Sequence, residues 1–441
     1  MCKNEGVVLN SSGSKKIAIV GAGYVGLAVG MGFVLLGNEV VFVDVSDDII
    51  RKINASQPPI YEEGLEDLMR NNRGKYRAEK SLDRAIADTD VAFITVNTPS
   101  REDGSADLSY LIEASVDVGK ALRNINRFYV VVVKSTVPPG TTENVVKPIL
   151  EEYSGKKAFG DFGLAVNPEF LREGTAIKDF LNPDRIVIGV NDERSREILE
   201  ELYSPIPAPK LIVDLKTAEI IKYVSNAFLA TKISFANEIG NLCKKLGIDS
   251  WKVFEGVGLD RRIGRHLLKP GLGWGGPCLP KDVRALINIF RQNGEEPLIL
   301  EAVYRVNKEQ TYRLIKLLKK LIPDLKGRRI GVLGLTYKPG VDDVRETIAY
   351  DVIRVLIDEG ARVIAHDPVG VEKFKAAYPD ISSSIEFAEV PEKVLEVAEA
   401  IVIVTDWPQY EELDYSGKIV VDGRRIKKAE KTAALYEGIC W

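Results

Sequence analysis

The segment from Lys15 to Ser46 constrains the fold more than any other part of this chain. It reads KKIAIVGAGYVGLAVGMGFVLLGNEVVFVDVS, which predicts a strand, a glycine-rich turn, a helix and a second strand that ends at an acid. Gly21 allows the tight turn, Gly23 lets the backbone approach a pyrophosphate, and Gly26 permits close packing of the helix on the strand. The helix N-terminus supplies N–H donors and a positive dipole to phosphates. The pattern therefore predicts a dinucleotide-binding βαβ unit rather than a merely tight turn.

The acid after the second strand is Asp44. It would accept hydrogen bonds from ribose hydroxyls and repel a 2′-phosphate, so NAD is favoured over NADP. Further strands are expected within Val91–Pro99, Phe128–Gly140 and Phe162–Phe170. In an open parallel sheet the ligand lies beyond the carboxyl ends of the strands. The polar residues that fall there, as cofactor ligands or as ordinary strand-end caps, are Thr98, Ser135 and Thr136.

A second strand, glycine turn, helix, strand and acid pattern begins near Lys326. It reads GRRIGVLGLTYKPGVDDVRETIAYDVIRVLIDEGARVIAHDP, and its acid is Asp367. The dinucleotide spacing of the glycines is not intact, which favours a mononucleotide-type domain. Four cations could bind phosphates or a base there, or could simply be solvated: Lys338, Arg345, Arg424 and Arg425.

Between the two patterns, Thr217–Gly247 predicts one long helix. Apolar residues recur at helical spacing, no proline interrupts, and Gly247 is a natural stop. Such a helix can bridge two domains and offer an apolar face to a second subunit. Lys222 and Asn226 lie one turn apart on it, either in a site or in solvent. We therefore expect two Rossmann-like, doubly wound α/β domains joined by a long central helix, with boundaries at 1–14 (flexible leader), 15–206, 207–322 and 323–441.

Composition excludes several classes of protein. The 441 residues carry a net charge of −4, and no basic run argues for nucleic acid. No apolar stretch of about 18 residues argues for a membrane span, and the N-terminus lacks the apolar centre of a secretory signal, so we expect a cytoplasmic protein. The four cysteines show no paired spacing, so neither a disulfide framework nor a metal site is expected.

Two short segments carry candidate chemistry. In NPEFLREG, Asn167 can cap a helix whose first position is Pro168, which would put Glu169 in the first turn and Glu173 one turn on. Acids in a first turn are often only dipole partners, so the residues alone do not make them catalytic.

The second segment is GLGWGGPCLPKD, where glycines on both sides leave the Cys278 thiol unshielded. Pro280 can open a helix, and a thiol at a helix N-terminus near Lys281 would have a lowered pKa. Asp282 lies close enough to hydrogen-bond with the thiol or with a water. Beside a hydride acceptor, a nucleophilic cysteine can trap an aldehyde as a thiohemiacetal, which is oxidised to a thioester and hydrolysed to an acid. The alternative is a packed thiol in a tight turn.

Taken in order, the motifs resemble a known family. They are GAGYVG, VNTP, KSTVPPGTT, NPEFLREG, IIKYVSNAFLATKISFANEIGNL, GLDRRIG, GWGGPCLPKD and LTYKPGVDDVRE. In this order and spacing the chain resembles the UDP-glucose 6-dehydrogenases of the nucleotide-sugar dehydrogenase superfamily, over nearly its whole length from Lys15 onward. The resemblance implies an NAD-dependent, four-electron oxidation of UDP-glucose to UDP-glucuronate by a homodimer built on the long helix.

The resemblance also implies roles for single residues. Cys278 would be the nucleophile, and Lys222 with Asn226 would stabilise the oxyanions of the alkoxide and thiohemiacetal stages. Thr136, Glu169 and Asp282 would position water and handle protons, in a division that stays open. The implied cofactor-binding residues are Gly21, Gly23, Tyr24, Val25, Gly26, Asp44, Thr98, Ser135, Thr136, Glu173 and Arg345. The implied substrate-binding residues are Glu169, Phe170, Leu171, Arg172, Glu173, Lys222, Asn226, Arg262, Lys269, Gly275, Tyr337, Lys338 and Arg424. Arg262 would reach into the partner subunit, and Arg425 is the alternative to Arg424.

The sequence departs from the family's usual GGSCFPKD at two positions. Pro277 replaces Ser, and Leu279 replaces the Phe beside the sugar pocket. Leucine there also occurs in the similar GDP-mannose dehydrogenases, whereas GLDRRIG and HLLKPG resemble the UDP-glucose enzymes. The runner-up function is thus the same chemistry on GDP-mannose, with a UDP-N-acetylhexosamine third. A non-catalytic nucleotide-sugar-binding dimer is the remote alternative, because such a protein has no reason to keep Cys278, Lys222, Asn226 and Asp282 together.

Overall fold

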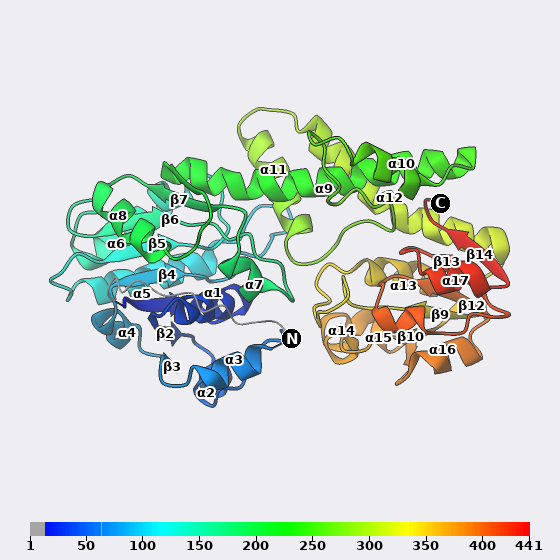
Figure 1. The fold of residues 1–441 in the computed structure, drawn as a ribbon, viewed down its shortest axis with the longest axis horizontal. Helices are drawn as coiled ribbons and strands as arrows, with labels where there is room; N and C mark the ends of the chain where they lie inside the picture. Colours follow the sequence, from blue (N-terminus) through cyan, green and yellow to red (C-terminus); the bar gives the residue numbers. More distant parts are fainter. Residues whose placement is uncertain (1–13, 63) are drawn as a thin grey trace. The chain divides into compact units, whose positions relative to one another are not determined.

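The computed structural model describes residues 14–62 and 64–441 (Figure 1). Its contacts divide the chain into two compact units, of which the first ends at Val224 and the second is Ser225–Trp441. The leader expected at residues 1–14 lies, except for Ser14, outside the described residues.

The first unit is built on a sheet of eight strands in the order β3-β2-β1-β4-β5-β6-β7-β8. Only the β6–β7 pair among them is antiparallel. The strands are β1 Lys16–Val20, β2 Glu39–Val43, β3 Tyr76–Glu79, β4 Val91–Ile94, β5 Val130–Val133, β6 Gly163–Val166, β7 Ile186–Val190 and β8 Lys210–Val213. The direction of winding reverses between β1 and β4, which is where a doubly wound sheet binds its ligand.

Helices cover both faces of this sheet. They are α1 Tyr24–Leu35, α2 Asp47–Asn54, α3 Leu65–Asn71, α4 Leu82–Asp88, α5 Ser109–Leu122, the π-helical turn η1 Thr142–Val146, α6 Lys147–Ser154, α7 Ala176–Leu181 and α8 Glu193–Leu202. Alternation along β1 explains the two layers, because Ile17 and Ile19 belong to one apolar core and Ala18 and Val20 to the other. Strands buried on both faces read as continuous apolar runs, as VVVV does in β5.

The second unit has a sheet of six parallel strands in the order β11-β10-β9-β12-β13-β14. The strands are β9 Arg329–Leu333, β10 Arg362–His366, β11 Ile385–Phe387, β12 Ala400–Ile403, β13 Ile419–Asp422 and β14 Leu435–Gly438. Its helices are α10 Ser250–Val257, α11 Leu279–Gln292, α12 Leu298–Leu321, α13 Ile348–Asp358, α14 Val371–Ala377, α15 Pro379–Ser382, α16 Pro391–Val397, the 3₁₀ turn η2 Pro408–Glu411 and α17 Lys427–Thr432. Counted along the chain, this is the same winding order as the first six strands of unit one, so both predicted Rossmann-like domains are confirmed.

The predicted long helix is α9, Leu215–Leu246, with 32 residues. Asp214 precedes it and accepts a hydrogen bond from Thr217 N–H at 2.9 Å, which explains a start two residues before the expected one. Gly247 follows it with φ of 68°, the left-handed conformation of a helix stop. The boundary between the two units falls inside α9. Among the helices of the described residues, none is long and apolar enough to cross a membrane.

Candidate active site

The glycine turn between β1 and α1 has the expected geometry. Gly21 has φ of 97°, and a Cβ on Gly26 would lie 1.9 Å from the Gly21 carbonyl oxygen, so helix and turn are too close for any side chain there. Asp44 stands beside the turn, where its Oδ2 accepts from Ala22 N–H at 2.8 Å. Tyr24 and Val25 are the first two residues of α1. The turn, the helix start and the acid therefore meet at the carboxyl end of β1.

The hydroxyls beyond β4 and β5 join the two loops that follow these strands. Thr98 Oγ1 donates to the Thr136 carbonyl at 2.7 Å, and Ser135 Oγ donates to the Val96 carbonyl at 2.6 Å. All three predicted residues thus lie at the edge of the sheet where a doubly wound fold binds its cofactor. Thr98 and Ser135 donate their hydroxyl protons to these carbonyls, so their oxygens could only accept hydrogen bonds from a ligand.

A buried ion pair lies in the first unit. Lys222 Nζ on α9 is 2.9 Å from Glu169 Oε1 in the loop after β6, and these side chains are only 5% and 8% exposed. Glu169 Oε2 also accepts from Leu171 N–H at 2.6 Å. Burial acts to raise the pKa of Glu169, but Lys222, the Leu171 N–H and the nearby Lys134 outweigh it, so the pKa lies below its usual value. Glu169 is therefore held as a carboxylate.

Lys134, at the end of β5, was not predicted as a site residue. Its Nζ donates to Asn167 Oδ1 at 2.7 Å and to the Asn167 carbonyl at 3.3 Å. Its pKa is lowered from 10.5 to about 7, because burial and, to a smaller extent, Lys222 lower it more than the Glu169 carboxylate raises it. The sequence did carry a signal, since a lysine directly after four valines of a buried strand has no route to solvent.

The helix expected from Pro168 is wrong. Residues 167–172 form no helix, and α7 begins only at Ala176. The physical reason is that Asn167 is buried and does not cap: it donates to the Val187 carbonyl at 2.7 Å and accepts from Lys134 and from Tyr203 OH. Glu169 and Glu173 therefore lie in a loop and gain nothing from a helix dipole.

The loop with the predicted substrate residues is tied to the first turn of α1. Tyr24 OH donates to Glu62 Oε2 at 2.5 Å and accepts from Gly174 N–H, and Glu62 Oε1 accepts from Ile177 N–H at 3.0 Å. Burial and the Glu62 carboxylate raise the pKa of Tyr24, so its hydroxyl stays protonated. Around this link, Leu171 packs against the apolar core. Phe170 lies under the Arg185 guanidinium, 3.7 Å from the ring centre, and Arg172 pairs with Asp179 at 2.6 Å.

In the second unit, Cys278 is half-buried at the N-cap of α11, with Pro280 in the first turn. Asp282 N–H donates to the Cys278 carbonyl at 3.0 Å. The Asp282 carboxylate is 1% exposed and accepts from Asn226 Nδ2 at 2.6 Å and from Lys281 Nζ at 2.5 Å. The first turn of α11 thus connects the thiol residue to Asn226 of α9.

Helix α9 supplies one partner to Glu169 and one to Asp282. Lys222 binds Glu169 and Asn226 binds Asp282, and both residues are buried. The pair is therefore not the idle solvent-facing pair that the spacing alone left open. A buried ammonium and a buried amide, one turn apart, are the donors that an oxyanion needs.

The glycines before Cys278 pack against the loop after β9. A Cβ on Gly275 would lie 2.4 Å from the Glu346 carbonyl oxygen, and one on Gly276, which has φ of 84°, would lie 2.5 Å from the Tyr337 ring. These contacts explain why glycine is required at both positions. The role of Gly275 in substrate binding remains a prediction.

The predicted cations of the second unit have different surroundings. Arg262 pairs with Asp260 at 2.6 Å and is 89% exposed. Lys269 lies over Trp251, 5.8 Å from the ring centre, and Lys338 over Tyr337 at 5.6 Å. Arg345 Nε donates to Asp343 Oδ2 at 2.8 Å.

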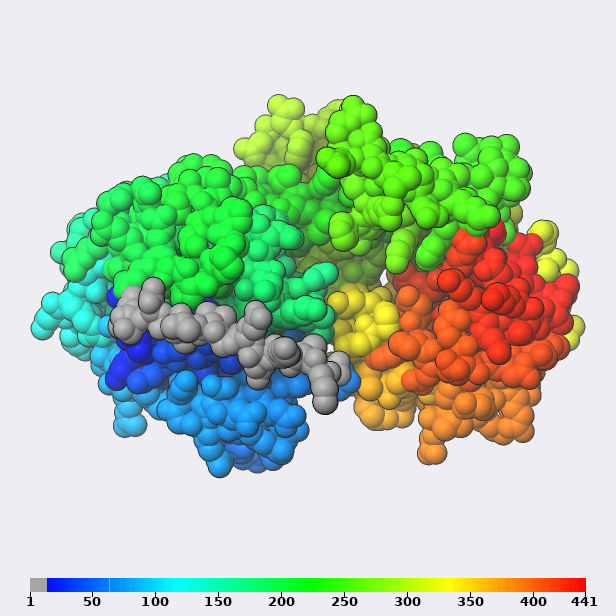
Figure 2. Space-filling model, in the orientation of Figure 1, coloured from blue at the N-terminus to red at the C-terminus, as the bar shows by residue number. Residues whose placement is uncertain are grey.

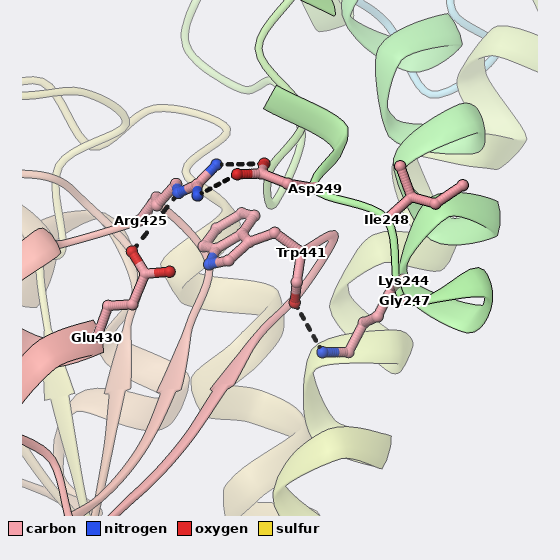
Figure 3. A pocket seen from close by; sticks show the side chains of 7 residues that line it. All are labelled: Lys244, Gly247, Ile248, Asp249, Arg425, Glu430 and Trp441. Carbon is pink, nitrogen blue, oxygen red and sulfur yellow. Dashed lines mark hydrogen bonds and ion pairs between the residues drawn. The ribbon is translucent and has the colours of Figure 1, made fainter. Parts of the chain in front are cut away.

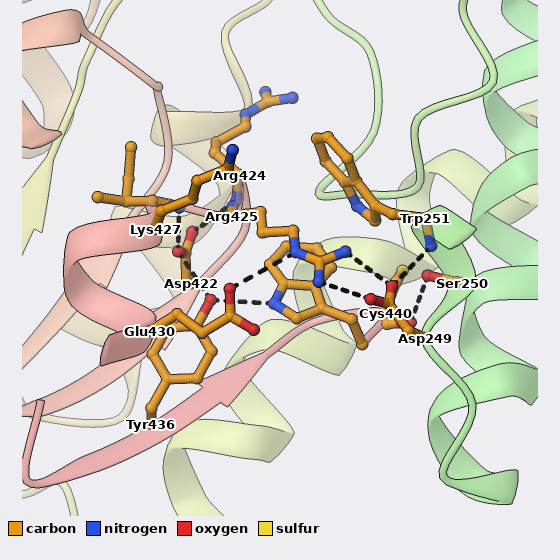
Figure 4. A network of polar contacts seen from close by, with 12 residues as sticks. Asp249, Ser250, Trp251, Asp422, Arg424, Arg425, Lys427, Glu430, Tyr436 and Cys440 are labelled. Atoms are coloured by element: carbon orange, nitrogen blue, oxygen red, sulfur yellow. Dashed lines mark hydrogen bonds and ion pairs between the residues drawn. The ribbon is translucent and has the colours of Figure 1, made fainter. Parts of the chain in front are cut away.

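The neighbouring Arg424 and Arg425 point in different directions (Figure 4). Arg424 Nε donates to the Val404 carbonyl at 2.6 Å and its Nη1 to the Gly273 carbonyl at 3.3 Å. Burial lowers the pKa of Arg424 from its usual value. Arg425 instead pairs with Asp249. Only Arg424 of the two contacts the loop that leads to Cys278.

No group of three or more His, Cys, Asp or Glu side chains that could hold a metal ion occurs in residues 14–62 and 64–441. Cys243, Cys278 and Cys440 form no disulfide with one another or with any other described residue. The glycine turn with Asp44 fits NAD, because the start of α1 offers backbone N–H groups that would meet phosphates and the Asp44 carboxylate lies beside the turn, where it could accept from a ribose.

A doubly wound sheet with an intact glycine turn and a following acid defines an α/β dinucleotide-binding protein. Three family models match the chain: the NAD binding domain at residues 15–207, the central domain at 216–309 and the UDP binding domain at 331–429 of one family. The chain belongs to the UDP-glucose/GDP-mannose dehydrogenase family.

Individual relatives agree with this assignment. The chain is 43% identical over 422 residues to the UDP-glucose 6-dehydrogenase of Haloferax volcanii, covering 93% of this chain and 97% of the relative. Among solved structures, the UDP-glucose dehydrogenase of Pyrobaculum islandicum has a TM-score of 0.94 and 47% identity, over 99% of this chain and 100% of that one. The GDP-mannose dehydrogenase of Pseudomonas aeruginosa has a TM-score of 0.56 and 37% identity, over 96% of this chain and 100% of that one.

Proposed function

We propose that this chain catalyses the NAD-dependent, four-electron oxidation of UDP-glucose to UDP-glucuronate. Family membership and the names of its relatives support the substrate. The observation that carries the chemistry is the first turn of α11, where Cys278 occupies the N-cap position and Asp282, one turn on, is hydrogen-bonded to the buried Asn226. A thiol with a polar, water-handling partner so close is what a cysteine nucleophile needs.

The reaction follows from the residue types. NAD, bound at the glycine turn with Asp44, supplies the acceptor for one hydride in each of two oxidations. The C6 alcohol loses a hydride and a proton to become an aldehyde, and the Cys278 sulfur adds to its carbonyl carbon to form a thiohemiacetal. Loss of the second hydride and a proton leaves a thioester. Water then attacks the thioester carbon, which releases the acid and returns the thiol.

Lys222 and Asn226 stabilise the negative oxygen that develops at the alkoxide and thiohemiacetal stages, since each is a buried donor. Glu169 and Asp282 are buried carboxylates that can take and return protons or orient the hydrolytic water, together with Thr136. Lys222 is paired with Glu169, so a proton that leaves the Lys222 ammonium has an acceptor in the Glu169 carboxylate, 2.9 Å away.

The remaining predicted residues bind the two ligands. NAD would be held by the glycine turn, Asp44 and the loops of Thr98, Ser135 and Thr136, and Glu173 and Arg345 are the other residues proposed to bind it. The nucleotide sugar contacts the loop from Glu169 to Glu173, and the other residues proposed to hold it are Lys222, Asn226, Arg262, Lys269, Gly275, Tyr337, Lys338 and Arg424. The enzyme works in the cytoplasm.

A second copy of this chain is proposed to pack on α9. Large apolar side chains on this helix are 50% to 64% exposed: Val224, Phe228, Phe235, Leu242 and Leu246. They follow one another at intervals of four or seven residues, so they form one stripe. Figure 2 shows green atoms of this part of the chain at the surface. A homodimer would cover the stripe, and the exposed Arg262 is the residue proposed to reach the partner's substrate. Light scattering of Phe228→Asp against wild type tests this, since loss of the dimer is expected and an unchanged mass would contradict it.

The runner-up substrate is GDP-mannose, on account of Leu279. A panel of UDP-glucose, GDP-mannose and UDP-N-acetylmannosamine, each with NAD, separates the candidates by kcat/KM. We expect UDP-glucose to exceed the others by at least about tenfold, because groups placed for one base and sugar are left unpaired by another. A higher kcat/KM for GDP-mannose would overturn the assignment. The non-catalytic dimer predicts no NADH with any sugar.

A further inference from the structure

The turn after β13 is held in an unusual conformation. Arg425 has φ of 67°, a left-handed value that costs a side-chain-bearing residue about 1 kcal/mol. The buried Asp422 carboxylate fixes the turn by accepting from the N–H groups of Arg424, Arg425 and Ile426 at 2.7, 2.9 and 2.6 Å. Tyr436 OH adds a fourth hydrogen bond at 3.0 Å. Four hydrogen bonds to one buried carboxylate therefore fix the backbone of this turn.

The Arg425 side chain reaches from this turn to the start of α10. Its guanidinium donates to both oxygens of Asp249, at 2.7 and 2.8 Å, and lies 5.3 Å from the Trp251 ring centre and 5.6 Å from that of Trp441 (Figures 3 and 4). Glu430 Oε2 is 3.6 Å from Arg425 Nε. Asp249, Arg425, Glu430 and Trp441 line a pocket of about 250 Å³ together with Lys244, Gly247 and Ile248, and its charged groups are already paired. A planar, two-pronged, aromatic-flanked contact is specific to arginine.

The segments around both residues of this ion pair, Arg425 and Asp249, hydrogen-bond to the loop that carries Cys278. At one end, Asp249 accepts from Trp251 N–H at 3.0 Å, and Trp251 Nε1 donates to the Pro270 carbonyl at 3.1 Å. At the other end, Leu272 N–H donates to the Gly423 carbonyl at 2.9 Å. Next to it, Arg424 Nη1 donates to the Gly273 carbonyl at 3.3 Å. The loop thus has two supports: Trp251 holds Pro270, and the turn after β13 holds Leu272 and Gly273.

Along this loop, Cys278 follows Gly273 by five positions. Asn307 fixes its next residue, Trp274, by accepting from the N–H and donating to the carbonyl, each at 2.8 Å. We propose that Arg425 is a positioning residue for the reaction: by joining the two supports it sets the place of the loop and hence of the Cys278 sulfur. The inference rests on the proposed role of Cys278 as nucleophile. Arg425 itself touches none of the reacting atoms.

The test measures the thiol directly. The full-length protein is treated with iodoacetamide from pH 5 to 10, and alkylation of the Cys278 peptide is followed by mass spectrometry. Arg425→Gln is expected to slow alkylation at pH 7 at least about threefold and to move its half-maximal pH upward, since the sulfur leaves its place at the helix N-terminus. With UDP-glucose and NAD, kcat is expected to fall about 10- to 100-fold, the scale of a 1 Å misplacement, while KM changes less.

Three further variants sharpen the experiment. Asp249→Asn removes the charge of the partner at constant volume and is expected to match Arg425→Gln, and it carries the test if Arg425→Gln does not fold. Arg425→Lys is expected not to rescue, because one ammonium cannot span both carboxylate oxygens. Arg328→Gln breaks an exposed ion pair with Glu399 in the same unit and is the control that leaves both readouts unchanged.

The inference is overturned if folded Arg425→Gln and Asp249→Asn keep the wild-type alkylation profile and kcat. A lower melting temperature alone would mean that Arg425 contributes only stability, which also overturns it. If wild type oxidises no UDP-glucose, the proposed function fails. The alkylation comparison would still report whether Arg425 positions the thiol.

Discussion

Replacing Lys134 by methionine should change how the stability of the first unit depends on pH. Lys134 is 4% exposed, and its pKa falls from 10.5 to about 7 in the folded protein. At about 1.36 kcal/mol per pH unit, this difference corresponds to about 5 kcal/mol between the folded-state costs of the charged and neutral forms. The methionine side chain has a similar shape and no charge, so it removes this pH dependence.

The sign follows from proton binding. Below pH 7 both folded and unfolded states hold the proton, and the folded state carries the full cost of burying the ammonium. Between pH 7 and 10.5 the unfolded state binds more protons, so the stability of wild type rises with pH relative to Lys134→Met. From pH 7.5 to 9.5 the free energy of unfolding of wild type minus that of Lys134→Met should rise by up to about 2.7 kcal/mol. This corresponds to about 5–10 °C in melting temperature for a unit of this size.

Differential scanning calorimetry at several pH values measures the two melting temperatures. Lys120→Met is the matched control, because it removes an ammonium of the same kind from α5 of the same unit at a position where the side chain is 56% exposed, and so separates the effect of burial from the loss of a lysine. If the difference in melting temperature between wild type and Lys134→Met stayed constant from pH 7.5 to 9.5, the claim that burial lowers the pKa of Lys134 would be refuted.

Three further outcomes are expected. Asn226→Ala removes one of the two side-chain donors to the buried Asp282 and should cost about 1–3 kcal/mol in urea unfolding, and no loss would contradict the buried pair. Tyr24→Phe breaks the link from α1 to the Gly174 N–H and should raise KM for NAD and nucleotide sugar together, whereas a change in neither would argue against that link. Asp44→Ala removes the carboxylate that repels a 2′-phosphate, so the NAD to NADP ratio of kcat/KM should fall at least about tenfold; an unchanged ratio would show that Asp44 does not select the cofactor.

The parts of the fold that the sequence predicted are those set by local geometry. Gly26 cannot carry a side chain 1.9 Å from a carbonyl oxygen, so the glycine pattern reports the turn directly. The uninterrupted apolar repeat before Gly247 predicted α9 to within two residues at its start, because helix periodicity and a left-handed stop are local signals. Cys278 at the start of α11 followed from Pro280 for the same reason.

The errors and omissions come from contacts distant in sequence. Asn167 looked like a helix cap, but its side chain hydrogen-bonds with Lys134, Tyr203 and the Val187 carbonyl, which lie 33, 36 and 20 positions away along the chain. The different roles of Arg424 and Arg425 depend on a left-handed turn and on Asp249, which lies 176 positions away along the chain. No local pattern encodes such pairings.

The central claim is that one active site carries UDP-glucose through both oxidations. The most direct measurement is the number of NADH molecules formed per molecule of limiting UDP-glucose, with the product identified by mass spectrometry. The account predicts two NADH and UDP-glucuronate for wild type, and no acid for Cys278→Ala. One NADH per sugar with an aldehyde product, or undiminished acid from Cys278→Ala, would contradict it.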